Sequence, residues 1–364
     1  MEAVLTWLKE YRSQPRTLDV YRKEAERFLL WASQRRGKTL SDLTRDDVLD
    51  YDRFMESPDR DWCGPTRPRT HPDWKPFAYW PSKTGAAAKG GLSVGSRQQA
   101  KTILSNLYNY LVQAGYLRHN PFALKRGRTK GIKTIHEDRI LEHEALEFLM
   151  RWLNDWPTET ERDVQHAERA RWLISLYYYS AARLREVTRA TMGEIRLIRG
   201  QWWWKVLGKG EKQGDVPVNK ALLEALKRYR QHLGLAELPS PSDTTPLVCS
   251  LYRKKHDPGY SAMSAAGIHK CMKDIMQRAA DDASLAGHDT IAAQLRRAST
   301  HWLRHSSASH QLDAGVPLLV VSQNLRHAKL ETTRRYLHAE DEMRHALSED
   351  WATRRPGHPA KGDN

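Results

Sequence analysis

Apolar residues recur at helical spacing through the first part of the chain. One stripe lies between residues 17 and 36, and a second lies between residues 96 and 114. The stripes consist of Leu18, Tyr21, Ala25, Phe28, Leu29 and Ala32, and of Ala100, Ile103, Leu104, Leu107 and Leu111. A period near 3.6 residues predicts amphipathic helices, and a glycine follows each stripe, as is typical of a helix end. We therefore predict a small helical bundle, with a further helix capped by Thr44 and Asp47.

Helical patterns continue after residue 140, with one exception. They occupy residues 141–153, 172–181, 221–233 and 264–280. Residues 200–218, GQWWWKVLGKGEKQGDVPV, are instead rich in Trp and Val around Gly-Lys-Gly, which is typical of strand, turn and strand. The predicted fold class is mainly α with a small antiparallel β-sheet.

The net charge of the chain indicates which class of partner it binds. The 364 residues carry a formal net charge of +15, and the sequence pI is about 9.7. A surplus of this size concentrates polyanions and favours nucleic acid. An acidic membrane surface is the other polyanion, but no basic amphipathic helix stands out, so we expect no membrane partner.

Cysteine usage and hydropathy indicate the compartment. The three cysteines are far apart and form no CxxC pair, which argues against a disulfide framework or a structural zinc site. No signal peptide and no apolar run of spanning length is recognised. We expect a cytoplasmic protein associated with the nucleoid.

Residues 57–93 interrupt the helical pattern with Pro, Gly, Trp and basic residues. A loop of this length is functional or disordered. Its interleaved aromatic and basic side chains, including Arg67 and Arg69, suit stacking and backbone contacts on DNA. A flexible insertion whose tryptophans fold back on the bundle explains the pattern equally well.

Residues 125–133, KRGRTKGIK, combine cations with two glycines and predict a linker between domains. A charge run is most often a solvated surface. Between two candidate DNA-binding domains, phosphate contact is the better interpretation. The candidate contacts are Lys125, Arg126, Arg128, Lys130 and Lys133.

The strongest chemical signal lies between residues 301 and 336. His301 and Arg304 are one helical turn apart, His327 follows, and Tyr336 comes nine residues later. Phosphodiester transfer needs cations that bind the phosphate through paired hydrogen bonds, a group that transfers protons, and a nucleophile. Arg, His and Tyr side chains supply these three functions. His301 and His305 also have metal-ligand spacing, but no third ligand is evident, so we predict no metal.

These residues, with two upstream segments, resemble the tyrosine recombinases of the phage integrase family. His-x-x-Arg-His, Leu-x-His and a Tyr nine residues on form the C-terminal part of the match. SAARLREV (180–187) resembles the first family box, and LGKGEKQGDVPV (207–218) resembles its β-hairpin. The resemblance implies site-specific DNA recombination without a cofactor.

The resemblance also assigns a role to each matched residue. Arg183, Arg304 and His327 would hold the scissile phosphate, and Glu186 would support them. Tyr336 would attack phosphorus to form a 3′-phosphotyrosine. Lys209 would protonate the departing 5′ oxygen, with Lys212 as the nearby alternative, and His301 would assist the proton transfer from the tyrosine. Four positions depart from the family pattern: Ala181 and Arg326 replace glycines, Ala182 replaces a leucine, and Gly214 replaces a frequent basic residue. Arg326 is a candidate for one more phosphate contact.

The implied organisation has four parts. Residues 1–124 would be a helical core-binding (SAM-like) DNA-binding domain, 125–136 a basic linker, 137–350 the catalytic domain, and 351–364 a disordered tail. The partner would be double-stranded DNA at specific sites. The protein would be a homotetramer on paired sites and a monomer or weak oligomer when it is not bound to DNA. A phage or another mobile element would be the source of such an enzyme.

Two alternatives share the pattern. A type IB topoisomerase would use the same chemistry to relax DNA as a monomer. A DNA-binding protein of the same fold without activity would keep the basic surface, although the complete set of catalytic positions argues against it.

Overall fold

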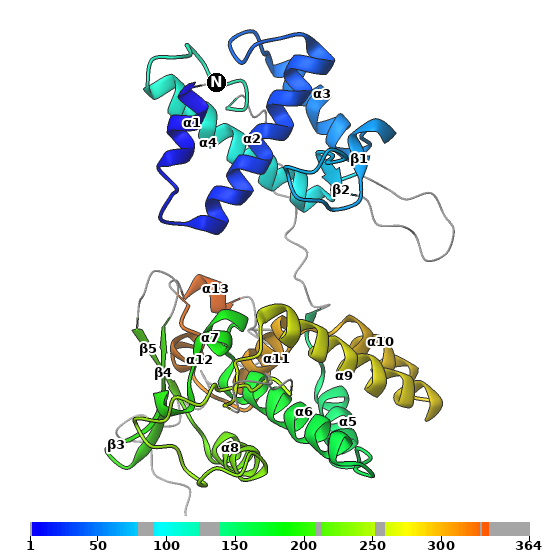
Figure 1. The fold of residues 1–364 in the computed structure, drawn as a ribbon, viewed down its shortest axis with the longest axis vertical. Coiled ribbons are helices and arrows are strands. Elements are labelled where there is room, and N and C mark those ends of the chain that lie inside the picture. The colour runs from blue at the N-terminus through cyan, green and yellow to red at the C-terminus, as the bar shows by residue number, and fades with distance from the viewer. Residues whose placement is uncertain are drawn as a thin grey trace, which may run out of the picture. The chain divides into compact units, whose positions relative to one another are not determined.

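The computed structural model describes residues 2–78, 91–123, 139–207, 213–251, 259–327 and 330–334. The chain divides into two compact units, residues 1–132 and residues 133–364 (Figure 1). Each has a hydrophobic core of its own and is treated by itself below.

The first unit is a bundle of helices. Its helices are α1 (Glu2–Lys9), α2 (Pro15–Arg36), α3 (Arg45–Glu56) and α4 (Val94–Gln113). The two helices that the apolar stripes predict are therefore confirmed as α2 and α4. The predicted cap is also present: the Asp47 carboxylate accepts from the Thr44 backbone N–H at 2.8 Å, and the Thr44 hydroxyl accepts from the Asp47 N–H.

The described part of the 57–93 segment packs onto this bundle. It forms the short helix η1 (Arg60–Trp62) and two short parallel strands, β1 (Cys63–Gly64) and β2 (Phe77–Ala78). Trp62 and Phe77 are buried in the core, and the Arg27 guanidinium donates to the Pro76 carbonyl at 3.2 Å. The fold-back interpretation therefore describes residues 57–78.

The second unit is mainly helical around one large core. Its helices are α5 (His143–Asn154), α6 (Glu161–Ser180), α7 (Leu184–Arg189), η3 (Met192–Glu194), α8 (Lys220–His232), α9 (Ala265–Leu285), α10 (Asp289–Arg297), α11 (Thr300–Asp313), α12 (Leu318–Asn324) and α13 (Glu331–Arg334). α6 lies in the middle of the unit and packs against α5, α8, α9 and α11, with Trp172, Leu173 and Tyr177 buried (Figure 1). The end of α6 is thereby fixed from several sides.

A three-stranded antiparallel sheet flanks these helices. β3 (Ile195–Ile198) pairs with β4 (Gln201–Leu207), which pairs with β5 (Gln213–Pro217). Trp204 and Val216 face each other in register, and both are buried in the core. The predicted pair of strands is confirmed, with β3 as an additional strand.

The fold class is mainly α with a small antiparallel sheet, as predicted. No helix within the described residues is long and apolar enough to span a membrane.

Candidate active site

Arg183 stands at a sharp turn between two helices. α6 ends at Ser180, and its C-cap Ala181 has a φ of 48°, in the left-handed region that non-glycine residues seldom adopt. Arg183 then has extended backbone and occupies the N-cap of α7. Its side chain is 40% exposed, so the guanidinium reaches the surface although the turn itself is buried. The turn thus presents a cation at the edge of a packed helix end.

Glu186 orients this arginine from the first turn of α7. Its carboxylate accepts from the Arg183 backbone N–H at 2.8 Å and from the Arg183 Nη1 at 3.0 Å. The first contact satisfies a backbone donor that every helix start leaves open, and the second fixes the guanidinium. Glu186 is only 5% exposed, so it acts as a buried anchor.

α11 supplies the second arginine. His301 and Arg304 both lie on this helix, His301 exposed in its first turn and Arg304 buried one turn later. The Arg304 guanidinium donates to two backbone carbonyls, those of Ala181 and Leu325. Arg304 therefore connects the turn that carries Arg183 with a second turn at the end of α12.

This second turn carries His327. Arg326, directly before the histidine, has a φ of 52° and so repeats the left-handed conformation of Ala181. The His327 N–H closes the turn by donating to the Ser322 carbonyl at 3.1 Å. The ring Nδ1 lies 2.8 Å from the hydroxyl of the buried Thr333, which fixes the ring orientation. The sequence did not single out Thr333, although its place between His327 and Tyr336 puts it within local reach.

The two turns bring four predicted residues together. Arg183 Nη2 donates to the Arg326 carbonyl at 3.2 Å, and Arg304 donates to the carbonyl of the preceding residue. Glu186 supports Arg183 from behind, and His327 follows directly in the chain. Two arginines from different helices that meet at the turn of a histidine can bind a tetrahedral anion with charge-assisted hydrogen bonds.

Arg326 has a partner that the sequence did not indicate. Its Nη2 donates to the Glu186 carboxylate at 2.5 Å and its Nε to the other oxygen at 3.4 Å. Its Nη1 donates to the Asn324 carbonyl at 2.8 Å. The side chain is only 12% exposed, so the guanidinium is turned to the protein, not placed as the extra phosphate contact that we considered. No local pattern could have shown a pair that joins residues so far apart in the sequence.

Glu186 is ionised because of these neighbours. Burial raises the pKa of its carboxyl group, but Arg326 and the hydrogen bonds from Arg183 and Arg326 more than offset burial, and the net shift of the pKa is downward. Burial lowers the pKa of the Arg326 guanidinium, and Glu186 opposes that effect. Both groups stay charged near neutral pH, as a stable ion pair requires.

Other predicted residues are not part of this cluster in the described structure. Lys209, Tyr336 and the cations Lys125, Arg126, Arg128, Lys130 and Lys133 lie outside the described residues. Arg69 pairs with Glu26 at 3.1 Å and stacks over the Trp74 ring at 4.2 Å, and Arg67 Nη1 lies 3.0 Å from the ring of His71. Both arginines are on the surface of the first unit.

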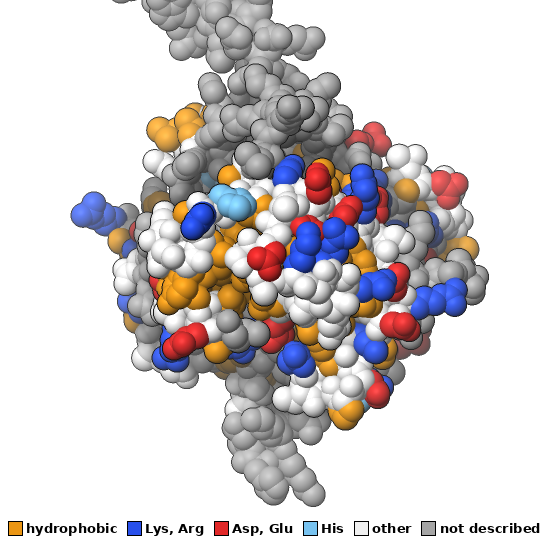
Figure 2. Space-filling view, turned by 90° about the horizontal axis from the view of Figure 1, so that it is seen from above, with side chains coloured by type: hydrophobic (Ala, Val, Ile, Leu, Met, Phe, Trp, Pro, Cys, Tyr) orange, Lys and Arg blue, Asp and Glu red, His pale blue; other side chains and the backbone are white. Residues whose placement is uncertain are grey.

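Charge on the molecular surface is mixed. Figure 2 shows a face on which Lys and Arg side chains alternate with Asp and Glu, with hydrophobic side chains visible between them. On the face shown, the described Lys and Arg side chains are therefore interspersed with acidic ones. Within the described ranges, no group of three or more His, Cys, Asp or Glu side chains could hold a metal ion.

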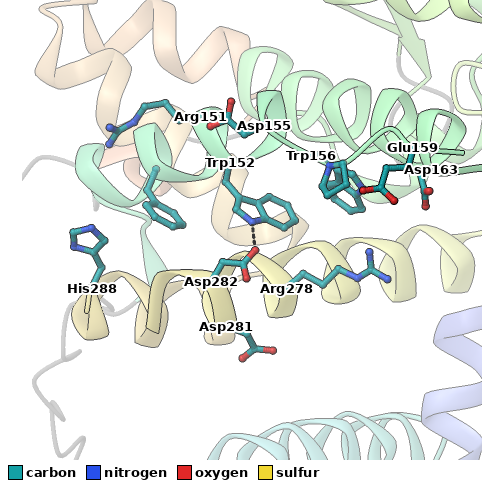
Figure 3. A pocket seen from close by; sticks show the side chains of 12 residues that line it. Arg151, Trp152, Asp155, Trp156, Glu159, Asp163, Arg278, Asp281, Asp282 and His288 are labelled. Carbon is teal, nitrogen blue, oxygen red and sulfur yellow. Dashed lines mark hydrogen bonds between the residues drawn. The ribbon is translucent and has the colours of Figure 1, made fainter. Parts of the chain in front are cut away.

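A separate groove lies in the second unit between α5 and α9. It has a volume of about 960 Å³ and is lined by Trp152 and Trp156, with Arg278 over the Trp156 ring (Figure 3). The Trp152 indole N–H donates to Asp282 at 2.5 Å. None of the predicted site residues that the structure describes lines it, so the groove and the arginine cluster are distinct features of the unit.

Sequence comparisons identify related proteins. The model of the family described as "Phage integrase family" matches residues 139–343. A "Tyrosine recombinase XerC" of Halalkalibacterium halodurans is 30% identical over 236 residues, which cover 65% of this chain and 68% of the relative. Another from Xylella fastidiosa is 30% identical over 254 residues, which cover 70% and 73%.

Solved structures have the same fold. A XerH site-specific recombinase bound to difH substrate has a TM-score of 0.58 at 18% identity, covering 96% of this chain and 84% of the other. The Tn1549 transposon integrase in complex with transposon right end DNA has a TM-score of 0.60 at 15% identity, covering 96% and 99%. At these identities the likeness is one of fold.

Proposed function

The chain belongs to the phage integrase family, and we propose that it cuts and rejoins double-stranded DNA at specific sites through Tyr336. The observation that carries this proposal is the convergence of Arg183, Arg304 and His327 on one turn. Such a cluster is complementary to a phosphodiester whose negative charge grows as phosphorus is attacked. Relatives of the same fold have been solved with their DNA, which supports the choice of substrate class.

The proposed reaction has two steps, cleavage of one DNA strand and its joining to another. The Tyr336 oxygen forms a bond to phosphorus as its proton passes to His301, and the bond from phosphorus to the 5′ oxygen breaks. Lys209 donates a proton to that oxygen, which leaves as a 5′-hydroxyl. The 5′-hydroxyl of a second DNA then attacks the phosphotyrosine, with the proton transfers reversed. The phosphotyrosine keeps the energy of the original bond, so no nucleotide is consumed.

Assembly and location complete the proposal. Exchange between two duplexes needs four cleavages, so a homotetramer on paired sites is the proposed active species, with a monomer or weak oligomer in the absence of DNA. Residues 1–124 and residues 137–350 would clamp the duplex, and the cations of 125–133 would contact its phosphates. The protein would be found with the nucleoid.

The first prediction tests the nucleophile. A pool of nicked duplexes with a randomised core traps the covalent intermediate, because the short strand released by cleavage diffuses away and cannot reverse the step. Wild-type protein is expected to form an adduct that survives denaturation, and sequencing of the trapped DNA identifies the preferred site. Tyr336→Phe should still shift this DNA on a gel but form no adduct, because it lacks the attacking oxygen.

Tyr260→Phe is the matched control. Tyr260 donates its hydroxyl to the Leu233 carbonyl and has no role in the proposed site, so this variant should keep the adduct. An undiminished adduct with Tyr336→Phe, or none with the wild type, contradicts the proposal. Relaxed plasmid without any two-site product would instead favour a topoisomerase.

A further inference from the structure

Arg326 occupies a position that a glycine would fill with less strain. A residue with a side chain is strained in the left-handed region, and glycine avoids that strain. Yet Arg326 adopts a φ of 52° while its guanidinium is held by Glu186 and the Asn324 carbonyl. The side chain must therefore contribute something that outweighs the backbone strain.

The contacts of Glu186 show what the side chain contributes. This carboxylate binds Arg183 through two hydrogen bonds and Arg326 through two more. The Arg326 carbonyl in turn accepts from Arg183. The three residues thus form a closed ring in which Arg326 contacts Glu186 with its side chain and Arg183 with its backbone.

Strand β5 limits the same side chain from the other side. A Cβ at Gly214 would lie 2.9 Å from Arg326 Cδ, which is closer than nonbonded carbons approach. The aliphatic part of Arg326 therefore fills the space over Gly214, and α12 and β5 are in contact. Arg326 links the sheet, whose β4–β5 connection contains Lys209, to the turn that carries His327.

We propose that Arg326 is a positioning residue that holds Arg183 and His327 in register through Glu186 and depends on Gly214 for its place. The proposal rests on the proposed function, because it concerns the alignment of those two groups on a phosphate. Arg326 itself does not touch the DNA. Among the described residues, the titratable groups that act on Glu186 are Arg183 at the N-cap of α7, Arg326 after α12, and the Tyr177 hydroxyl of α6.

The test uses two substitutions of the same kind. Arg326→Gly removes the guanidinium and relieves the left-handed strain. Arg199→Gly makes the same change at an exposed residue of the β3–β4 turn, where φ is 51°. A difference in cleavage between the two variants is therefore due to loss of the Arg326 side chain, and not to the change in backbone strain that both share.

Cleavage of the trapped DNA sequence is measured for both as a function of pH. Arg326→Gly is expected to cleave more slowly by roughly tenfold to a hundredfold, as a displaced reacting group does. The acid limb of its pH profile should move to higher pH, because Glu186 loses the cation that keeps it ionised. Arg326→Lys, which restores one charge, should recover part of the rate and of the shift. Arg199→Gly should match the wild type in both.

Urea unfolding of the same proteins gives a readout that needs no DNA. The folded pKa of Glu186 is below its unfolded value, so its ionisation stabilises the fold above the unfolded pKa, and this contribution disappears as pH falls through the folded pKa. The difference in midpoint between wild type and Arg326→Gly should therefore shrink in acid. Gly214→Ala should slow cleavage in the wild type and have no added effect in Arg326→Gly.

The outcomes separate the two proposals. Wild-type rate and pH profile in Arg326→Gly, or a midpoint difference that is the same at all pH values, would overturn the role of Arg326. An absent wild-type adduct together with the pH-dependent midpoint difference would contradict the proposed function and leave the ion pair established.

Discussion

The turns at Ala181 and Arg326 have the same backbone conformation for different reasons. Both are left-handed, both follow a helix, and Arg304 donates to a carbonyl in each. The Ala181 methyl group is buried in a small apolar cluster with Ala308, Leu312 and Val321. Arg326 instead places a guanidinium against a buried carboxylate.

Backbone conformation alone therefore does not decide which residue a turn tolerates. Ala181 contributes one methyl group, worth about 0.8 kcal/mol of apolar burial, against a strain of similar size. Arg326 contributes hydrogen bonds between charged groups, each worth about 1.5–3 kcal/mol. Glycine should therefore substitute for the first residue and not for the second.

The largest expected effect comes from the residue that both turns share. Arg304→Lys keeps a charge but cannot donate to two separated carbonyls and a phosphate at once. Cleavage should fall by roughly 10²–10³, the cost of one lost transition-state donor. Single-turnover cleavage of the trapped sequence measures it. Arg296→Lys, a substitution of an exposed residue in α10, is the control and should have no effect. A small loss with Arg304→Lys would mean that the two turns keep their positions without the hydrogen bonds from Arg304.

Removal of the anion should affect both turns, because the Glu186 carboxylate binds Arg183 beside the first turn and Arg326 in the second. Glu186→Gln leaves the Arg326 guanidinium buried without a countercharge, and we expect a loss of about 2–3 kcal/mol in unfolding free energy at neutral pH. The loss should diminish as pH falls, because the pKa of Glu186 is lowered in the fold and its stabilising charge disappears in acid. Urea unfolding at several pH values tests this. The exposed Glu144→Gln on α5 serves as control, and equal losses at all pH values would show that charge is not the cause.

The smallest effect is expected at Ala181. Ala181→Gly should change the unfolding free energy by less than about 1 kcal/mol, since strain relief and the lost methyl group nearly cancel. Ala181→Val should be clearly worse, because a β-branched side chain does not fit the left-handed region. Thermal unfolding measures both variants. A glycine variant as damaged as the valine variant would show that the methyl packing dominates.

Local patterns predicted most of the fold. The stripes behind α2 and α4 and the Trp- and Val-rich β4 need only neighbouring residues to be recognised. β3 was missed because its four residues carry too short an alternation to be distinguished from a loop.

Spacing and resemblance together found Arg183, Glu186, Arg304 and His327, which the structure brings together. They could not show that Arg326 pairs with Glu186, or that the fold-back of residues 57–78 gives Arg69 a carboxylate partner. Those contacts join distant segments, and they exist only after the core has placed the helices.

The contact between Gly214 and Arg326 also constrains how such a sequence can change over generations. A Cβ at position 214 would lie 2.9 Å from Arg326 Cδ, so any side chain there requires the arginine to shift. We therefore expect arginine at 326 to be found together with glycine at 214. The two positions should covary across lineages even though neither is expected to touch the DNA.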